Sequence, residues 1–264
     1  MRLFVAFLFM LISLPANASD ISLKGDFIQG GLIIGKTRPG ALIALDGGKV
    51  EQSDDGYFLL GFNRDAKPEA QLTVRFQDGT DARRQFKIKK RNYDIQRIDG
   101  LPKRKVTPSL EDLKRIKSER AQIAKAKRLR VRSAYFRSGF IRPVKGRISG
   151  VYGSRRILNG QPGRLHYGLD IAAPSGTPVK AAAAGKIAFT HPGMFFNGKT
   201  VIINHGLGLT STYIHMSDIS VKVGDIVVKG QIIGKIGKTG RATGPHLHWS
   251  LRLNNQELDP ALLF

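Results

Sequence analysis

Gly244-Pro245-His246-Leu247-His248-Trp249 places two imidazoles two residues apart, directly after a Gly-Pro turn. Alternate side chains of an extended strand point to the same side, so both imidazoles lie on one face of a sheet if this stretch is a strand. Two histidines on one such face suit a divalent metal ion better than an apolar core. The stretch therefore predicts a metal site at the start of a strand.

The segment His166-Tyr167-Gly168-Leu169-Asp170 offers the second part of such a site. If it is also extended, His166, Gly168 and Asp170 share a face. Gly168 would then leave the space between the two ligating groups empty. Imidazole and carboxylate are both ordinary zinc ligands, so this segment adds two candidates for the predicted metal.

A third segment, Ser211-Thr212-Tyr213-Ile214-His215, alternates as a strand does and places His215 on a sheet face. Together the three segments predict one bound zinc ion with two further imidazoles beside it. Three protein ligands leave the fourth tetrahedral position open for water, which is typical of a catalytic zinc. The expected ligands are His166, Asp170 and His248, and the expected neighbours are His215 and His246.

Composition limits the class of protein. The 264 residues include no cysteine, which excludes a disulfide scaffold and any thiolate metal site. The net charge is +23, and residues 101–150 alone carry sixteen basic and three acidic side chains, a balance of +13. Such a stretch attracts a polyanion, namely nucleic acid, anionic lipid head groups or an anionic cell-wall polymer, or else it is a solvated helix without a fixed partner. We expect no specific nucleic-acid partner, and the sequence does not indicate an oligomeric state.

Residues 1–18 have the pattern of a secretory signal peptide. Arg2 provides the basic start, residues 3–14 are almost entirely apolar, and Ala16-Asn17-Ala18 is a cleavage site of the A-x-A type. The apolar run is shorter than the roughly 20 residues that span a bilayer, which argues against the alternative, an uncleaved anchor. We therefore expect an exported protein, located in the periplasm of a Gram-negative cell, whose mature chain starts at Ser19.

Residues 19–100 are expected to form a β-rich module of the sandwich type. Turns that contain Gly and Asp recur at short intervals, which favours a sandwich over a fold with helices. No cluster of catalytic residue types occurs here, so the module is expected to be structural, docking or regulatory. The clearest strands are expected at residues 41–45, 57–62, 71–76 and 84–88.

Residues 101–142 are expected to form a basic helical linker. Thr107-Pro108 is typical of a helix start, with proline in the first turn. Apolar residues then recur near helical spacing over about five or six turns. This narrow stripe could pack on either domain or lie on an anionic surface, and its lack of aromatic residues favours packing. The stripe consists of Leu110, Leu113, Ile116, Ile123 and Ala124.

Residues 143–264 are expected to form a second all-β domain. Glycine-rich turns separate short alternating runs, which predicts stacked antiparallel sheets without a βαβ unit. The whole chain is therefore assigned to the all-β class, with an N-terminal sandwich-like module, a basic linker helix and a C-terminal antiparallel sheet that carries the metal site. The strands of this sheet are expected at residues 186–190, 200–204, 209–216, 226–229, 231–236 and 246–253.

The motifs of residues 143–264 occur in an order that resembles a known family. They include His166-x-Gly-x-Asp170, Thr212-Tyr-Ile-His-Met216, Val223-Gly-Asp-Ile-Val-Val-Lys-Gly-Gln-Ile-Ile-Gly234 and Thr239-Gly-Arg-Ala-Thr-Gly-Pro-His-Leu-His248. In this order they are similar to the lysostaphin/LytM-type zinc endopeptidases, which cut peptide cross-links of bacterial peptidoglycan. The leader before residue 143 is only weakly similar to the leaders of some Gram-negative relatives.

This resemblance implies a zinc metalloendopeptidase that hydrolyses peptidoglycan cross-links through a metal-activated water. It leaves open which cross-link is cut and how the two catalytic histidines divide their work. Ser250 departs from the family pattern, because many relatives have an acid after the aromatic residue. The resemblance implies metal ligands at His166, Asp170 and His248 and catalytic partners at His215 and His246.

Two other functions remain as alternatives. Some proteins of this fold activate other wall hydrolases without being enzymes, although here every ligand position is filled. The basic helix could instead make the chain a wall-binding module. For the enzyme itself, we expect the leader to cover the catalytic groove until it is displaced.

Four further polar residues are expected to lie outside the catalytic machinery. His191 and His205 are expected to be structural. Arg155 and Arg156 are expected to be solvated, with a substrate carboxylate as the alternative partner.

Overall fold

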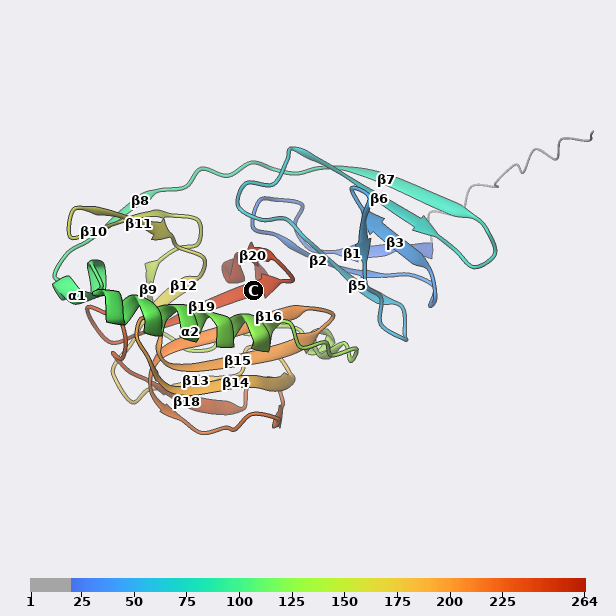
Figure 1. Ribbon diagram of the computed structural model, residues 1–264. Coiled ribbons are helices and arrows are strands. Elements are labelled where there is room, and N and C mark those ends of the chain that lie inside the picture. Colours follow the sequence, from blue (N-terminus) through green and yellow to red (C-terminus); the bar gives the residue numbers. More distant parts are fainter. Residues whose placement is uncertain (1–19) are drawn as a thin grey trace, which may run out of the picture.

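The computed structural model describes residues 20–264, which form two β-rich parts joined by a long strap and a helix (Figure 1). The predicted signal peptide at residues 1–18 lies outside the described residues. No helix within residues 20–264 is both long and apolar enough to cross a membrane.

The N-terminal part is a sandwich of two antiparallel sheets, as the turn spacing predicted. Alternation decides which side chains enter it: in β6 (Glu69–Arg75), Ala70, Leu72 and Val74 are buried, and their neighbours face outward. These residues pack against Ile33 and Phe58 of the facing sheet. One sheet has the order β1 (Ser22–Lys24), β2 (Leu32–Lys36), β5 (Tyr57–Gly61), and the other has the order β4 (Gly48–Val50), β3 (Leu42–Leu45), β6, β7 (Asp81–Lys87).

After β7 the chain runs as a strap to the second part, where β8 (Ile95–Ile98) pairs with β10 (Arg155–Leu158) (Figure 1). The pairing is parallel, with Gln96 beside Arg156, and β10 also pairs with β11 (Gln161–Leu165). Parallel neighbours require a long crossover connection, which the two helices between β8 and β10 supply. The antiparallel prediction did not include this pair, which joins residues 19–100 to the second domain.

The linker forms two helices, α1 (Lys103–Val106) and α2 (Leu110–Lys127). The prediction that the helix starts at Thr107-Pro108 was wrong by two residues, because Ser109 is the N-cap. Its hydroxyl accepts a hydrogen bond from the Asp112 N–H at 3.2 Å, and the Asp112 carboxylate accepts from the Ser109 N–H at 3.3 Å. This reciprocal capping box fixes the first turn.

The helix packs on the second domain, as expected, but of the predicted stripe only Ile116 is buried. Leu110 is 82% exposed and Leu113 is 48% exposed. The buried positions of α2 are Asp112, Ile116, Glu119 and Ala126. Glu119 is buried because its carboxylate accepts hydrogen bonds from the backbone N–H of Phe195 at 2.8 and 3.0 Å. Periodicity cannot predict a helix face that is held by such polar contacts.

The second part is a large antiparallel sheet, which confirms the assignment to the all-β class. Within the described residues it has ten strands, and its main path is β17-β14-β15-β16-β19-β12-β9, with β13, β18 and β20 beside it. The strands are β9 (Arg147–Gly150), β12 (Leu169–Ala172), β13 (Pro178–Lys180), β14 (Gly185–Met194), β15 (Gly198–Gly206), β16 (Leu209–Ile219), β17 (Ile226–Val227), β18 (Ile232–Ile236), β19 (His246–Leu253) and β20 (Gln256–Leu258).

The two parts share an apolar core. Leu32 and Leu59 of the sandwich pack in one cluster with Leu209 and Leu251 of the large sheet and with Phe136. Phe136 lies in the short 3-10 helix η2 (Tyr135–Ser138) and is fully buried. Removal of the leader would therefore expose apolar surface on the second domain.

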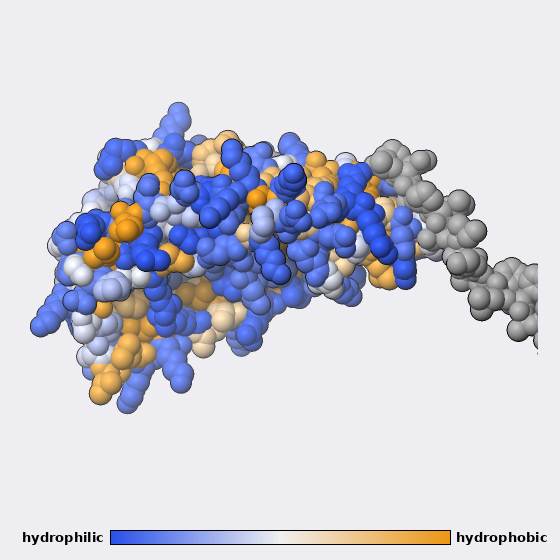
Figure 2. All heavy atoms as spheres, turned by 90° about the horizontal axis from the view of Figure 1, so that it is seen from above, coloured by the Kyte–Doolittle hydropathy of each residue, from blue (hydrophilic) through white to orange (hydrophobic). Residues whose placement is uncertain are grey.

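The outer surface is mainly polar. Seen from above, hydrophilic residues cover most of the face, and hydrophobic residues are scattered among them in small groups (Figure 2). Neighbouring basic residues on α2, among them Lys114, Lys117 and Arg120, are exposed. The positive stripe predicted from the sequence is therefore on the surface, although the helix that carries it is docked.

Candidate metal centre

Pairing of β12 with β19 brings the first two functional segments together. In this antiparallel pair Asp170 lies opposite His248, and Ala172 lies opposite His246. Leu247 and Trp249 alternate with the histidines and are fully buried in the core on the other face. Because the apolar residues anchor that face, the two imidazoles must emerge on the opposite one.

Three side chains converge on one point, where His166, Asp170 and His248 each present a ligand atom. The Nε2 atom of His166 lies 3.1 Å from Oδ1 of Asp170 and 2.9 Å from Nδ1 of His248. The third side of the triangle, from His248 Nδ1 to Asp170 Oδ1, is 2.8 Å. His166 and Asp170 are buried, and His248 is partly buried.

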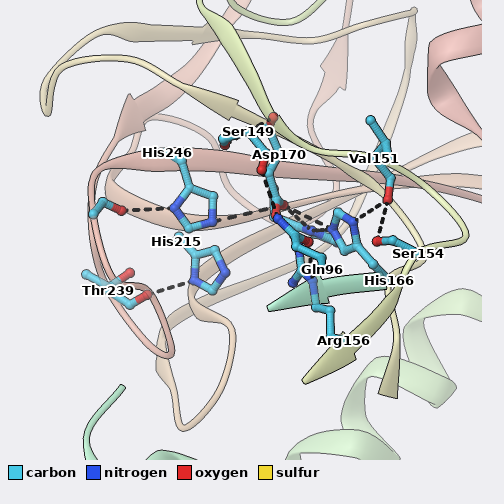
Figure 3. Close-up of polar contacts among 12 residues, drawn as sticks. Gln96, Ser149, Val151, Ser154, Arg156, His166, Asp170, His215, Thr239 and His246 are labelled. Atoms are coloured by element: carbon cyan, nitrogen blue, oxygen red, sulfur yellow. Dashed lines mark hydrogen bonds and ion pairs between the residues drawn. The ribbon is translucent and has the colours of Figure 1, made fainter. Parts of the chain in front are cut away.

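The donor set fits a zinc ion. Tetrahedral zinc with bonds of about 2.0 to 2.2 Å keeps its ligand atoms about 3.3 to 3.6 Å apart, so the triangle would need to widen by only about half an ångström. The Nδ1–H of His166 donates to the carbonyl of Val151 at 2.8 Å, which leaves the Nε2 lone pair free for a metal (Figure 3). Two imidazoles and one carboxylate form an ordinary zinc set with an open fourth position.

Protonation states also suit a cation. Burial opposes ionisation of Asp170, but its close contacts with the His166 and His248 imidazoles outweigh burial and hold the pKa of this carboxyl well below its usual range. Burial lowers the pKa of His248 to about 4, although the neighbouring Asp170 acts in the opposite direction. At neutral pH Asp170 is therefore ionised and the His248 imidazole is neutral, as metal ligands must be.

Gly168 has a different role from the one predicted. His166 precedes β12 and is not part of an extended run with Asp170. A Cβ atom at Gly168 would lie 2.6 Å from Cε1 and 2.7 Å from Nε2 of His248. The missing side chain therefore makes room for the His248 ring, not for a gap between His166 and Asp170.

His215 and His246 stand beside the triangle, with their ring centroids 4.7 Å apart (Figure 3). The Nδ1–H of His215 donates to the carbonyl of Thr239 at 2.8 Å, and that of His246 donates to the carbonyl of Gly244 at 2.9 Å. Each Nε2 is then free to act as an acceptor, and that of His246 lies 4.0 Å from Asp170 Oδ1. One loop thus orients both imidazoles through its carbonyl groups.

His215 is unusual in its backbone and in its environment. Its φ angle is +66°, which is uncommon for a residue other than glycine and is found most often at functional sites. Burial, followed by the nearby His246 and His248, holds the pKa of His215 well below the usual value. The imidazole is therefore neutral near pH 7 and can accept a proton.

The prediction that Arg156 is solvated was wrong, whereas Arg155 is exposed as expected. A guanidinium nitrogen of Arg156 forms an ion pair with Asp170 Oδ2, the carboxylate oxygen outside the triangle. Its Nε donates to the side-chain oxygen of Gln96 at 3.0 Å, and Gln96 donates to the carbonyl of Ser149 at 2.9 Å (Figure 3). Sequence reasoning missed Gln96 because no local signal predicts the pairing of β8 with β10.

The site opens into a cavity of about 230 Å³, which Asp170, His215 and His246 line. Gln96, Ile98 and Leu101, all from the leader, form part of its wall. A larger cavity of about 1130 Å³ lies against the N-terminal sandwich, and its lining contains no histidine. The candidate chemistry therefore belongs to the smaller cavity.

The two remaining histidines of the second domain lie outside the site, as expected. His205 is fully buried, with Nδ1 2.7 Å from the Ala184 carbonyl and Nε2 2.7 Å from the Ser211 hydroxyl. Burial lowers its pKa to about 4. His191 accepts a hydrogen bond from the Gly193 N–H at 3.0 Å. Both are structural residues.

Comparison with known proteins agrees with this geometry. Residues 164–260 match the family described as peptidase family M23. Over 118 residues the chain is 44% identical to the DD-carboxypeptidase/endopeptidase Mpg of Neisseria meningitidis serogroup B, covering 44% of this chain and 27% of that protein. Over 111 residues it is 44% identical to the peptidoglycan DD-endopeptidase ShyA of Vibrio cholerae, covering 40% and 25%. The chain thus spans about a quarter of the length of these curated relatives.

A solved structure extends the match beyond the catalytic part. The crystal structure of a peptidase M23 from Pseudomonas aeruginosa is 33% identical and superposes with a TM-score of 0.67. The match covers 89% of this chain and 94% of that one, so it includes most of the leader. On this likeness over nearly the whole length, together with the motif-bearing segment, the chain belongs to peptidase family M23.

Proposed function

We propose that this protein is a zinc-dependent endopeptidase that hydrolyses peptide cross-links of bacterial peptidoglycan. The observation that carries the proposal is the convergence of three donor atoms within 3.1 Å of one another, beside the imidazoles of His215 and His246, which line a cavity. The relatives named as peptidoglycan endopeptidases support the substrate class.

His166, Asp170 and His248 would hold the zinc ion. Zinc bound there would polarise a scissile carbonyl and lower the pKa of a coordinated water toward about 7. Arg156 engages the second oxygen of Asp170, which keeps Oδ1 turned toward the two histidines. The Val151 carbonyl accepts a hydrogen bond from the Nδ1–H of His166, which fixes the tautomer of that ring.

His215 and His246 would move protons. Each has its Nδ1–H engaged by a loop carbonyl, so proton exchange at each ring is left to Nε2. Such an imidazole can accept the proton of an attacking water and pass it to the leaving amine. Once protonated, it can donate a hydrogen bond to the negative charge that develops on the carbonyl oxygen.

Mass spectrometry of muropeptides tests the proposal. Purified peptidoglycan is incubated with the wild type, with His246→Ala and with Asp170→Ala, and the zinc content of each protein is measured. The wild type should convert cross-linked muropeptides into monomers. His246→Ala should bind zinc but not hydrolyse peptidoglycan, whereas Asp170→Ala should neither bind zinc nor hydrolyse peptidoglycan. Identical products from all three proteins would refute the proposed mechanism.

The two alternative functions differ in their support. A non-enzymatic activator of wall hydrolases would not need the complete donor set, so that alternative is disfavoured. Wall binding through the exposed basic residues of α2 is compatible with catalysis. Binding to purified sacculi should then collapse at high salt, because exposed charges are screened. Salt-independent binding would show that the stripe is not the binding surface.

We also propose that the leader controls access to the site. The support is that Gln96, Ile98 and Leu101 line the catalytic cavity. A comparison with residues 143–264 alone is a poor test, because the shared core around Leu209 and Leu251 would be uncovered. Locking the leader in place is a cleaner experiment.

The absence of cysteine allows such a lock. Arg97 and Ile157 are Cα partners in the β8–β10 pair, and Arg97 is exposed between two cavity-lining residues. The double variant Arg97→Cys, Ile157→Cys would form a single disulfide. If the leader must move, the oxidised protein is inactive and a reductant restores activity. The single-cysteine variants are the controls. Equal activity of the oxidised and the reduced protein would show that the leader does not have to move for hydrolysis.

Export to the periplasm belongs to the same proposal. It is supported by the signal-peptide pattern of residues 1–18 and fits a substrate that lies outside the cytoplasmic membrane. Fractionation of cells that express the full chain tests it, and N-terminal sequencing should place Ser19 at the start of the exported form. Retention of the protein in the cytoplasm would refute it.

A further inference from the structure

The catalytic cavity contains more positive charge than its acids can balance. Arg147, Arg156 and Arg241 line it, and Asp170 is the single acidic residue of the lining. Arg156 is already engaged with Asp170. Arg147 and Arg241 therefore line the cavity without an acidic partner among residues 20–264.

Arg241 is the more informative of these two arginines. It is half-buried, and its guanidinium lies 4.4 Å from the centre of the Phe196 ring. Its backbone N–H donates to the Phe196 carbonyl at 2.8 Å, which anchors the residue to the turn between β14 and β15. Burial, followed by repulsion from Arg156, Arg164 and Arg120, lowers the pKa of Arg241 to about 10. The group is still charged at neutral pH.

Such an environment is unusual for a structural arginine. A charge that is partly removed from water is normally paired, because desolvation without a partner costs free energy. Several other half-buried arginines of this protein follow that rule. Arg91 pairs with Asp259 at 2.7 Å, and Arg252 pairs with Glu257 at 2.9 Å. Arg241 instead stands among other arginines, so the missing partner is best sought outside the chain.

The position of Arg241 links it to the reaction centre. The loop between β18 and β19 supplies the Thr239 carbonyl that orients His215 and the Gly244 carbonyl that orients His246. Arg241 belongs to the same short loop and lines the same cavity as both imidazoles. An anion bound by Arg241 would therefore lie beside the bond that these histidines help to break.

We propose that Arg241 and Arg147 form a subsite that binds a free carboxylate of the peptide substrate. This inference rests on the proposed endopeptidase function and specifies its substrate. Guanidinium groups bind carboxylates through paired N–H donors, and the ring of Phe196 holds one of them in place. The carboxylate has two possible sources: the C-terminus of a peptide strand, or the side chain of a residue next to the scissile bond.

Two pairs of synthetic cross-linked peptides test this subsite with the full chain. In one pair the C-terminal carboxylate is either free or amidated. In the other pair the side-chain carboxylate next to the scissile bond is either free or amidated. The specificity constant kcat/KM is measured for the wild type, R241Q, R147Q and R155Q, and thermal unfolding confirms that each variant folds. Arg155 is exposed and does not line the cavity, so R155Q is the matched loss of charge.

The wild type should prefer the free acid over the amide by about tenfold or more in one of the pairs, as expected for a charge-assisted hydrogen bond. That pair identifies the source of the carboxylate. R241Q and R147Q should lose most of the preference, because they slow cleavage of the acid much more than cleavage of the amide. R155Q should keep the preference. R241K should keep part of it, because lysine retains the charge without the paired donors.

Two results would overturn the subsite. One is equal cleavage of acid and amide by the wild type in both pairs. The other is an equal loss on acid and amide in R241Q and R147Q, which would mean that these arginines only support the loop. If the wild type cleaves none of the four peptides, the proposed function fails instead. Calorimetric binding of the same acid and amide peptides to the wild type then decides the subsite by itself.

Discussion

The N-terminal sandwich and the C-terminal sheet are both built from alternating antiparallel strands, but they bury different chemistry. The sandwich core consists of apolar residues such as Ile33, Phe58 and Leu72. The large sheet buries His205, Ser211 and other polar groups beside its apolar core. A buried polar group is costly unless it is hydrogen-bonded, so each one needs a specific partner. The comparison teaches that the sandwich is built for stability, whereas the sheet holds polar groups in fixed positions for chemistry.

This contrast predicts that substitutions in the two regions fail in different ways. In the sheet, loss of a polar site residue should abolish chemistry and leave the fold intact. In the sandwich, loss of an apolar residue should reduce stability while the chemistry survives. Among single substitutions, the largest loss is expected at the metal centre and the smallest at Gly168.

The largest effect is expected for His166→Ala in the metal centre. Loss of one of three ligands should remove zinc, and hydrolysis should fall on the order of a thousandfold, because metal polarisation contributes several kcal/mol. Zinc content and muropeptide release measure the two effects. Asp218→Ala, an exposed acid on β16, is the matched control. A zinc-loaded, active His166→Ala protein would break the comparison.

The next largest effect is expected for Phe58→Ala in the sandwich. Phe58 is fully buried, and removal of its ring should cost about 3 to 5 kcal/mol of unfolding free energy through lost burial and a cavity. Urea denaturation measures this loss. Zinc affinity and hydrolysis, assayed where the variant is folded, should change little. If Phe58→Ala loses zinc binding while it remains folded, then the sandwich also supports the metal centre and the contrast between the two regions fails.

A smaller effect is expected for Gly168→Ala. The added Cβ would lie 2.6 Å from the His248 ring, so the ring must move away from the triangle. Zinc affinity, measured by competition with a chelator, should fall by about tenfold to a hundredfold. Gly193→Ala is the control, because no heavy atom lies within 4 Å of a Cβ built there. Equal affinities in the two variants would show that the ring has room to spare.

A further expected difference between the two regions concerns pH. All six histidines lie in residues 143–264, and burial lowers the pKa of His205 and of His248 to about 4. In the unfolded chain these groups titrate near pH 6.5, so below that pH the unfolded state binds more protons. The stability contributed by the neutral, buried imidazoles is thus complete above about pH 6.5 and is lost as the pH falls toward 4.

Trp249 reports this loss. It is the single tryptophan of the chain and is fully buried in the large sheet. Its fluorescence should show a urea midpoint that falls between pH 6.5 and pH 4 in the zinc-free protein. Amide hydrogen exchange in β6, corrected for the intrinsic effect of pH, should change less. A Trp249 midpoint that is constant over this range would contradict the predicted cost of protonation.

Local patterns in the sequence were sufficient for the elements and for the donor types. Strand β19 occupies residues 246–253 as predicted, because alternation with Leu247 and Trp249 leaves only one arrangement for the histidines. The docked face of α2 was not predictable, because Glu119 is buried through a hydrogen bond from the backbone N–H of Phe195, in the turn after β14. Arg156 was misjudged for the same reason, since its partner Asp170 becomes a neighbour only in the folded sheet.

The sequence alone determined which residue types are present, the period at which they repeat and the order of the motifs, because these depend on neighbours a few positions apart. Tertiary structure alone decided that β8 of the leader lines the catalytic cavity and that Gly168 makes room for His248. It also decided that Arg241 lines the same cavity as His215 and His246, without an acidic partner among residues 20–264. These are contacts between segments far apart in the chain, and strand pairing and side-chain packing select them only once the whole chain has folded.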